Sequence, residues 1–222
     1  MNWNIPISEA IRVQKDLATR VRFEPLPPDI RLVAGADVAI LKPREELLAG
    51  IVLWDLQDRK VVEQAAARAR AAFPYVPGLL SFREAPAVLE AFAKLYHKPD
   101  VAMFDGQGIA HPRRFGLASH LGVILDMPSI GCAKSRLIGT YQEPAPDRGS
   151  WTDLTDKGET IGAVLRTRAN VNPLYISVGH RCDLPSAINL VLQCAPRYRL
   201  PEPTRLAHQL VTTEKARIPP AP

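Results

Sequence analysis

Hydrophobic side chains recur every three or four residues in five parts of the chain, which is the spacing of one face of an α-helix. The predicted helices are residues 7–22, 85–98, 115–125, 184–194 and 204–211. Other apolar stretches are shorter and are bounded by turn residues, which is typical of β-strands. The predicted strands are residues 31–41, 50–56, 60–70, 101–104, 128–133, 159–166 and 174–178.

The order of these elements predicts how the strands pair. The first three strands follow one another with short links, which favours an antiparallel meander. Strand, helix and strand then alternate over residues 101–133, which implies parallel pairing through a right-handed crossover. We therefore expect an α/β fold in which helices flank both faces of a mixed sheet, the layout of ribonuclease H-like folds. Residues 140–157 are polar and are expected to form a surface excursion.

The length of 222 residues suits one domain with a full hydrophobic core. No linker and no internal repeat divides the chain, so we expect a single domain over residues 1–222. The proline-rich end, from about residue 213, is expected to be a disordered tail. We also expect a monomer.

Composition and charge narrow the function only slightly. The net charge of +5 weakly favours a polyanionic partner. Three cysteines without a CxxC motif favour reduced thiols in the cytoplasm. The first residues lack the pattern of a signal peptide, and polar residues interrupt the most apolar window, residues 115–130. We therefore expect a cytoplasmic protein that does not bind membranes.

Two carboxylates stand where buried strands are predicted to meet solvent. Asp37 closes the apolar run RLVAGA, and Asp105 closes VAMF. Two such aspartates can share one hard cation bound through oxygen. The alternative is that each side chain caps a turn, and for Asp105 the following Gly106 favours a turn as well.

A third carboxylate, Glu84, has two interpretations. The stretch SFRE, from Ser81 to Glu84, matches a capping box. Pro86 opposes that reading, because its missing N–H would already be needed if Ser81 were the N-cap. We therefore expect the helix to begin at residues 84–85, with Glu84 projecting from its mouth toward the strand ends.

Further candidates lie in the loops around these carboxylates. Tyr75 lies between two prolines that restrict the loop, so its ring either fills the gap left by a displaced base or packs under the loop. The loop after Asp105 has glycines that let a base or phosphate approach its backbone, and His111 adds a polar group or a surface cap. Lys134 follows a predicted strand, where it either contacts a phosphate or is solvated. The chain has no GxSxG motif, no GxxxxGK[ST] loop and no dinucleotide fingerprint.

These residues lie in stretches that resemble endonuclease V, the deoxyinosine 3′-endonuclease family. The matching stretches follow the family's order over nearly the whole chain: GADVA at 35–39, PYVPGLLSFRE at 74–84, FDGQGIAHPRRFGLASHLGV at 104–123, PSIGCAKSRL at 128–137, ISVGHRCDLPSAI at 176–188 and LPEPTRLAH at 200–208. The resemblance implies a ribonuclease H-like fold and a requirement for Mg²⁺, for which Mn²⁺ can substitute.

The resemblance also implies roles for individual residues. The metal-binding aspartates correspond to Asp37 and Asp105, the essential glutamate to Glu84 and the catalytic lysine to Lys134. Glu84 and His208 are further metal-ligand candidates. The wedge tyrosine corresponds to Tyr75, and the hypoxanthine pocket to loops at 78–80 and 105–108 with 117–122 beside them. With His111 of the same loop, the residues expected to bind substrate are Tyr75, Gly78, Leu80, Gly106, Gly108, His111, Leu117 and Gly122.

The implied reaction is a step in DNA repair. A nuclease would recognise deoxyinosine in damaged DNA and hydrolyse the second phosphodiester bond 3′ to it, leaving 3′-hydroxyl and 5′-phosphate ends. Three alternatives stay open at this point. They are the same chemistry on inosine-containing RNA, a catalytically silent nucleic-acid-binding protein, and a Mg²⁺-dependent enzyme that acts on small nucleotides.

Overall fold

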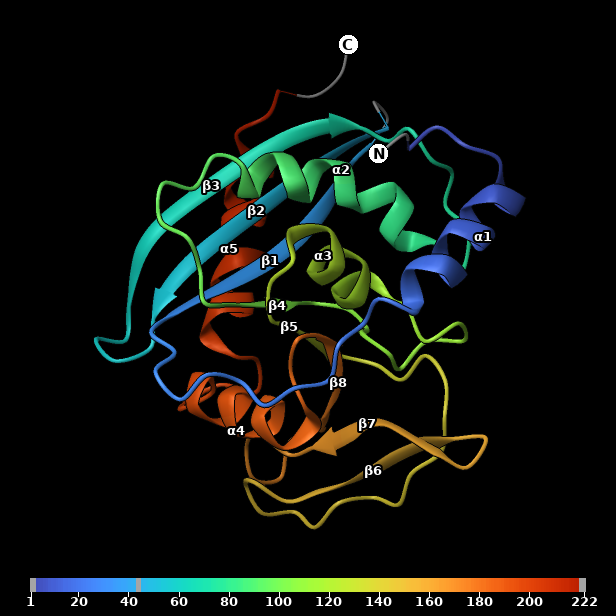
Figure 1. Cartoon of the computed structure of the whole chain (residues 1–222). Helices are drawn as coiled ribbons and strands as arrows, with labels where there is room; N and C mark the ends of the chain where they lie inside the picture. The colour runs from blue at the N-terminus through green and yellow to red at the C-terminus, as the bar shows by residue number, and fades with distance from the viewer. Residues whose placement is uncertain (1–2, 43–44, 220–222) are drawn as a thin grey trace.

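The computed structural model describes residues 3–42 and 45–219 (Figure 1). Within them eight strands form one sheet in the order β3-β2-β1-β4-β5-β8-β7-β6. The strands are β1 (Leu32–Leu41), β2 (Glu46–Asp55), β3 (Lys60–Arg70), β4 (Val101–Phe104), β5 (Ser129–Ala133), β6 (Trp151–Asp156), β7 (Glu159–Leu165) and β8 (Leu174–His180). The helices are α1 (Ile7–Ala18), α2 (Leu80–Phe92), α3 (Leu117–Leu125), α4 (Leu184–Cys194) and α5 (Glu202–Ala216).

The pairing of the strands confirms the predicted mixed sheet. β1, β2 and β3 are antiparallel neighbours, as expected for a meander. β4 runs parallel to β1 on one side and to β5 on the other, so the segment from β4 through α3 to β5 is the predicted crossover. β8, β7 and β6 complete the sheet by antiparallel pairing.

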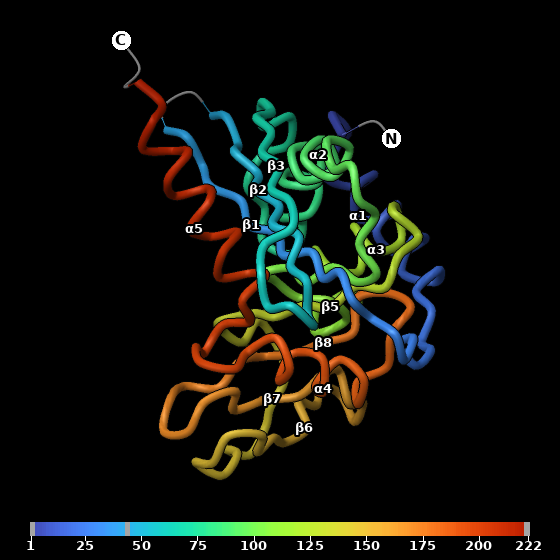
Figure 2. The backbone as a smooth tube through the Cα atoms, turned by 90° about the vertical axis from the view of Figure 1, so that its left-hand side faces the viewer, coloured from blue at the N-terminus to red at the C-terminus, as the bar shows by residue number. Residues whose placement is uncertain are grey.

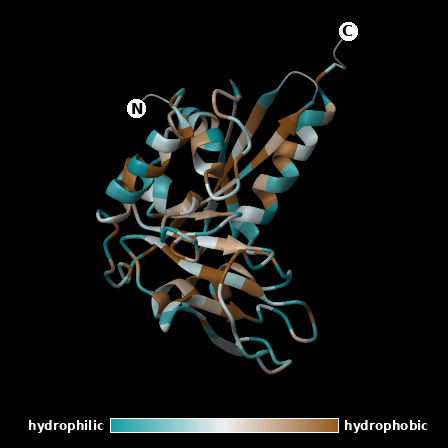
Figure 3. Cartoon of the chain, turned by 90° about the vertical axis from the view of Figure 1, so that its right-hand side faces the viewer, coloured by the Kyte–Doolittle hydropathy of each residue, from teal (hydrophilic) through white to brown (hydrophobic). Residues whose placement is uncertain are grey.

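Helices cover both faces of the sheet, as predicted. Figure 2 shows α5 on one side of β1 and β2, and α1, α2 and α3 on the other. One core joins α2 and α3 to that face through Ala34, Leu47 and Phe104. A second core joins α4 to the opposite face through Val33 and Met103, whose side chains alternate with those of the first core. Figure 3 shows hydrophobic colour along strands in the middle of the molecule.

Two glycines allow α5 to lie close to the sheet. A Cβ atom at Gly35 would lie 2.0 Å from the backbone carbon of Pro203, at the start of α5. A Cβ atom at Gly50 would lie 2.7 Å from a methyl carbon of Val211. Both distances are shorter than van der Waals contact, so larger residues would push the helix away. The close approach brings the N-terminal half of α5 next to β1.

α1 and α2 end four and six residues earlier than predicted, and β2 begins four residues earlier. Beyond these shifts, the structure differs from the sequence prediction at three elements. β6 lies within the predicted surface excursion, and only its Leu154 is buried, so this edge strand has almost no hydrophobic signal. α5 continues to Ala216, so the predicted disordered tail is wrong for residues 213–216, where Val211 on the preceding turn anchors the helix to β2. Residues 220–222 of that tail lie outside the described residues.

The third difference is the start of α2, which begins at Leu80 rather than at residues 84–85. Leu79 is the N-cap residue and no side chain caps the helix, so the capping box is absent, as expected from the sequence. Pro86 therefore lies inside the helix, where it costs about 3 kcal/mol because the carbonyl of Phe82 loses its donor. The first turn is held by burial of Phe82 against Phe73 and Leu79, and this packing outweighs the cost of the proline.

In the part of the chain that the structure describes, no helix is long and apolar enough to span a membrane.

Candidate active site

Two aspartates meet because of the register between β1 and β4. Ala36 pairs with Phe104 in the parallel ladder, and Asp37 and Asp105 are the next residue on each strand. β4 ends there, whereas β1 continues to Leu41, so Asp37 lies inside a strand and does not cap a turn. Glu84, on the second turn of α2, completes the group. All three carboxylates line one cavity of about 100 Å³.

The surroundings of Glu84 raise the pKa of this carboxyl group. Burial raises the pKa of Glu84 to about 8, and the neighbouring charges of Asp37 and Asp105 add to the effect. Glu84 is therefore protonated at neutral pH as long as no cation offsets its neighbours. Three carboxylates around one small cavity are an oxygen-rich donor set of the kind that hard divalent cations prefer.

Two cationic or polar side chains contact the aspartates. Lys134, directly after β5, makes an ion pair with Asp105. His208, on α5, donates a hydrogen bond from Nδ1 to Oδ2 of Asp37 at 2.8 Å. Among the described residues no three His, Cys, Asp or Glu side chains are arranged as a ready cage for a metal. The carboxylate oxygens suit a divalent cation. In the present side-chain positions, however, Asp37 is hydrogen-bonded to His208 and Asp105 is ion-paired with Lys134.

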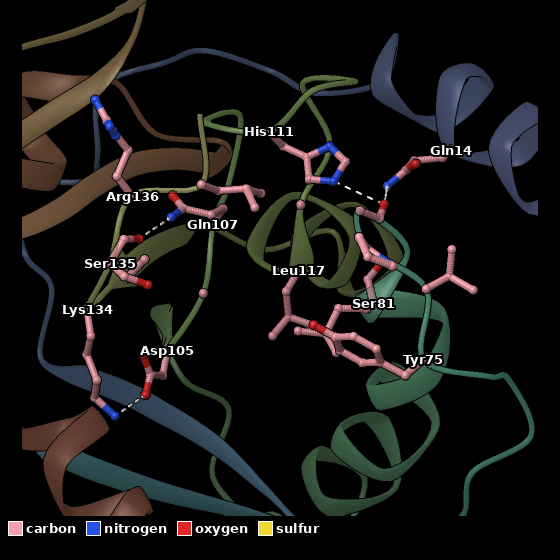
Figure 4. A pocket seen from close by; sticks show the side chains of 18 residues that line it. Gln14, Tyr75, Ser81, Asp105, Gln107, His111, Leu117, Lys134, Ser135 and Arg136 are labelled. Carbon is pink, nitrogen blue, oxygen red and sulfur yellow. Dashed lines mark hydrogen bonds and ion pairs between the residues drawn. The ribbon is translucent and has the colours of Figure 1, made fainter. Parts of the chain in front are cut away.

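A larger cavity of about 390 Å³ adjoins the carboxylates (Figure 4). Asp105, Leu117 and Leu80 line both cavities, so a ligand in the larger one lies beside the acidic group. Six of the residues predicted to bind substrate line the larger cavity: Tyr75, Gly78, Leu80, Gly106, His111 and Leu117. The structure thus brings the predicted pocket and the predicted carboxylates together.

Gly108 and Gly122 do not line this cavity. A Cβ atom at Gly108 would lie 2.0 Å from the carbonyl oxygen of Val178, and the Gly108 amide donates to Ser177. A Cβ atom at Gly122 would lie 2.0 Å from the hydroxyl of Ser129. Both glycines let backbone segments pack closely against β5 and β8, and their place in the structure gives them no direct access to the cavity.

The tyrosine of the proline-bounded loop is exposed. Tyr75 retains 68% of its accessible surface, so the alternative that it packs under the loop is wrong. His111, by contrast, is buried, so the alternative that it is a surface cap is wrong too. Burial and the charge of Arg113 lower the pKa of His111 to about 4, which keeps its ring neutral at physiological pH.

Some residues of the cavity were not predicted from the sequence. Gln14, Gln107 and Arg136 line it, although none lies at a motif position that predicts chemistry. One feature of the sequence could have identified Gln14, because it is a polar residue in the otherwise apolar stripe of α1. The structure shows that it is buried. Gln107 donates to the carbonyl of Ser135, which links the loop after β4 to the loop after β5.

Another buried histidine supports the wall of the cavity and yields a testable pH dependence. The Nδ1 atom of His120 lies 2.9 Å from the hydroxyl of Ser81, and its ring packs between Phe82 and Phe115. Burial lowers the pKa of His120 from its usual 6.5 to about 4. Between these values the unfolded chain binds a proton that the folded protein does not, so stability falls as the pH falls.

We expect His120→Leu to weaken this acid sensitivity. From pH 7 to pH 5 the wild-type free energy of unfolding should drop by about 2 kcal/mol more than that of the variant. Urea unfolding at the two pH values measures the difference. His97→Leu, at an exposed histidine, is the control. Equal drops in wild type and His120→Leu would mean that His120 is protonated in the folded protein.

Comparisons with known proteins agree with this geometry. The family model described as Endonuclease V matches residues 15–209. The endonuclease V of Methanothrix thermoacetophila is 50% identical over 98% of this chain and 95% of its own. The crystal structure of endonuclease V from Streptomyces avermitilis is 44% identical, with a TM-score of 0.93 over 96% of this chain and 94% of that one. This match confirms the ribonuclease H-like fold expected from the sequence.

A third relative was crystallised with nucleic acid. The endonuclease V of Ciona intestinalis, in complex with a 24mer DNA containing an inosine followed by a ribo-adenosine, is 27% identical. Its TM-score is 0.85 over 96% of this chain and 99% of that one. The similarity extends over nearly the full length of all these proteins and includes the stretches that carry the carboxylates and the cavity. This chain belongs to the endonuclease V family.

Proposed function

We propose that this protein is a DNA repair endonuclease that recognises deoxyinosine and hydrolyses the second phosphodiester bond 3′ to it. The products would carry 3′-hydroxyl and 5′-phosphate ends. One observation carries the proposal: the cavity of about 390 Å³ shares Asp105, Leu117 and Leu80 with the smaller cavity that the three carboxylates line. A flipped base and a scissile phosphate can thus be held side by side.

The cavity has the features of a base-binding site. Its volume lies in the range of small-molecule pockets, and backbone of Gly78 and Gly106 borders it. Enzymes that act on a displaced base read the edge of that base with hydrogen bonds. We infer that backbone N–H groups of the loops at 78–80 and 105–108 distinguish the oxygen of hypoxanthine, which accepts a hydrogen bond, from the amino group of adenine, which does not.

The acidic cluster suits Mg²⁺, with Mn²⁺ as a substitute. Asp37 and Asp105 would hold the ion, and Glu84 and His208 are further ligand candidates. A bound divalent ion of this kind activates water and stabilises the leaving oxygen. The hydrogen bond from His208 orients the carboxylate of Asp37, and the ammonium of Lys134 beside Asp105 can offset negative charge on a phosphate. A bound cation would offset the charges of Asp37 and Asp105 that raise the pKa of Glu84, so Glu84 would ionise and could join the ligands or orient the water.

The remaining expectations from the sequence stay proposals. We propose that the chain acts as a monomer and as one domain. Its three cysteines are free and buried, which supports the cytoplasmic location inferred from their number and spacing.

Tyr75 should matter for recognition more than for chemistry. We expect Tyr75→Ala to reduce the preference for deoxyinosine DNA over undamaged DNA by about tenfold or more, because stacking of a base on an aromatic ring contributes about 1–3 kcal/mol. Binding assays on the two duplexes measure this preference. Tyr96→Ala, at a tyrosine that is 90% exposed, is the matched control. An unchanged preference in Tyr75→Ala would show that Tyr75 is not the wedge.

A nicking assay tests the proposed function as a whole. An end-labelled duplex with one deoxyinosine is incubated with the protein and Mg²⁺, Mn²⁺ or EDTA, next to an undamaged duplex. We expect a single nick, at the second bond 3′ to the lesion, only with a metal. Matched RNA with inosine serves as a parallel arm, and faster cleavage of that RNA would favour the endoribonuclease alternative. No nick in any arm would favour a silent binding protein.

A further inference from the structure

We propose that Gln14, together with His111 and Arg113, is a clamp that positions the Tyr75 loop for recognition of the lesion. The proposal rests on the proposed function, because it assigns positioning residues to the same site. The clamp acts on the carbonyl oxygen of Gly78, which ends the segment 74–78. Gln14 lies on α1, just outside the residues 15–209 that match the family model.

Three side chains donate hydrogen bonds to this one oxygen. Gln14 Nε2 lies 3.0 Å from it, His111 Nε2 3.0 Å and Arg113 Nη2 2.6 Å. Figure 4 shows Gln14 and His111 reaching the same oxygen from different sides. A carbonyl oxygen has two lone pairs, so three donors occupy all of its acceptor capacity. The Gly78 carbonyl is therefore fixed in direction as well as in place.

Hydrogen bonds that link Gln14, His111 and Arg113 to one another show which group donates and which accepts. Because a carbonyl only accepts, Nε2 of His111 carries the proton, and its Nδ1 accepts from the backbone amide of Arg113 at 3.1 Å. Gln14 uses its whole amide group, since it also donates to the carbonyl of Phe115 at 2.7 Å and accepts from Nε of Arg113. Gln14 thus joins α1 to both the 74–78 segment and the loop after β4.

Gly78 has no room for a side chain within this clamp. Its φ of 76° lies in the left-handed region, which favours glycine. A Cβ atom there would also lie 2.8 Å from Nη2 of Arg113. The backbone conformation and the position of the donors therefore match each other, as expected for a preorganised site.

The other end of the loop is held as well, so Tyr75 lies between two fixed points. The ring of Phe73 is buried, and its carbonyl accepts a hydrogen bond from Arg83 at 2.8 Å. Between Phe73 and Gly78 the side chain of Tyr75 is exposed, and no side-chain hydrogen bond to another described residue holds it. The direction of Tyr75 consequently depends on the two anchors, Arg83 of α2 at one end and the clamp with Gln14 of α1 at the other.

The experiment compares Gln14→Leu with the wild type in two measurements. First, amide hydrogen exchange should report a looser loop: the Leu79 amide, which donates to the Val76 carbonyl at 2.9 Å, should exchange about tenfold faster. Second, KM for deoxyinosine duplex should rise about tenfold, while the single-turnover rate at saturating protein changes less than about threefold, because the carboxylates are untouched.

A double-mutant cycle separates positioning from a general structural role. In a Tyr75→Ala background, Gln14→Leu should add less than about twofold to KM, because the side chain that the clamp positions is already gone. Gln193→Leu, at an exposed glutamine of α4, is the matched control and should change neither measurement. An equal increase in KM with and without Tyr75 would overturn the proposal, and so would unchanged exchange of Leu79.

A second variant covers the case that Gln14→Leu fails to fold. Gln14→Glu keeps the volume and can still accept from Arg113, but it cannot donate to Gly78, so the same faster exchange is expected. Wild-type protein that does not nick deoxyinosine DNA would contradict the proposed function. The exchange measurement needs no substrate, so it decides on the clamp in that case also.

Discussion

Replacing Asp105 with alanine should reduce cleavage of deoxyinosine DNA by about a thousandfold or more, because a carboxylate of the metal-binding pair is lost. Asp105 lies at the end of β4, beside Asp37 on β1, and borders both the acidic cavity and the larger one. Among the residues that the structure describes, Asp105 is the carboxylate that lines both cavities. Single-turnover nicking in Mg²⁺ measures the loss.

The same variant should keep or improve its binding of deoxyinosine DNA. It removes an anion from a surface that faces phosphates, and it releases the ammonium of Lys134 from its ion pair. Asp147→Ala, at an exposed aspartate far along the chain, is the matched control for the loss of one carboxylate. Turnover like that of the wild type in Asp105→Ala would contradict the metal assignment. Lost binding together with lost cleavage would point to misfolding.

Replacing Glu84 with glutamine should inactivate the protein and at the same time stabilise it at alkaline pH without metal. In the wild type, the folded pKa of about 8 lies above the usual 4.5. Between these two pKa values the folded protein binds a proton that the unfolded chain does not. The contribution of Glu84 to the free energy of unfolding is therefore fully present below pH 4.5 and is lost as the pH rises to 8. Allowing for partial exposure of Glu84, the loss amounts to about 3 kcal/mol.

Glutamine removes this loss because it carries no titratable proton. In EDTA, the free energy of unfolding of Glu84→Gln should therefore decrease less between pH 5 and pH 8 than that of the wild type. Glu90→Gln, at an exposed position of the same helix, should follow the wild type. Adding Mg²⁺ at pH 8 should raise the wild-type unfolding midpoint, since a bound cation favours the ionised carboxylates, and should raise that of Glu84→Gln less.

Equal pH dependence of Glu84→Gln and wild type in EDTA would mean that Glu84 ionises normally in the folded protein. Nicking activity within about tenfold of the wild type would remove Glu84 from the catalytic group, because loss of a general acid or base costs about a hundredfold or more. The two readouts are independent, so the stability prediction does not depend on the substrate.

The sequence predicted much of the fold because most elements have a strong hydrophobic pattern of their own. β3, β4 and α4 have the predicted bounds, since each is apolar on a face or throughout and ends at a turn residue or cap. The start of α2 was not predicted. The proline rule is a local rule, and burial of Phe82 by residues of other elements outweighs it. β6 was missed because an edge strand with one buried residue needs its partner, β7, to be recognised.

The residues of the candidate site also divide into those that the sequence predicted and those that only the structure revealed. Asp37, Asp105 and Lys134 were found from the sequence because their places after apolar runs are local features, and the resemblance added the role of Glu84, whereas Arg136 was missed. Their mutual geometry was not available, because Asp37 and His208 are 171 positions apart and Gln14 and Gly78 are 64 apart. The sequence by itself determined the mixed α/β fold, the carboxylates and the lysine. Only the tertiary structure decided the proton affinity of Glu84, the burial of His111 and the clamp on Gly78, since burial and neighbouring charge arise from contacts between distant segments.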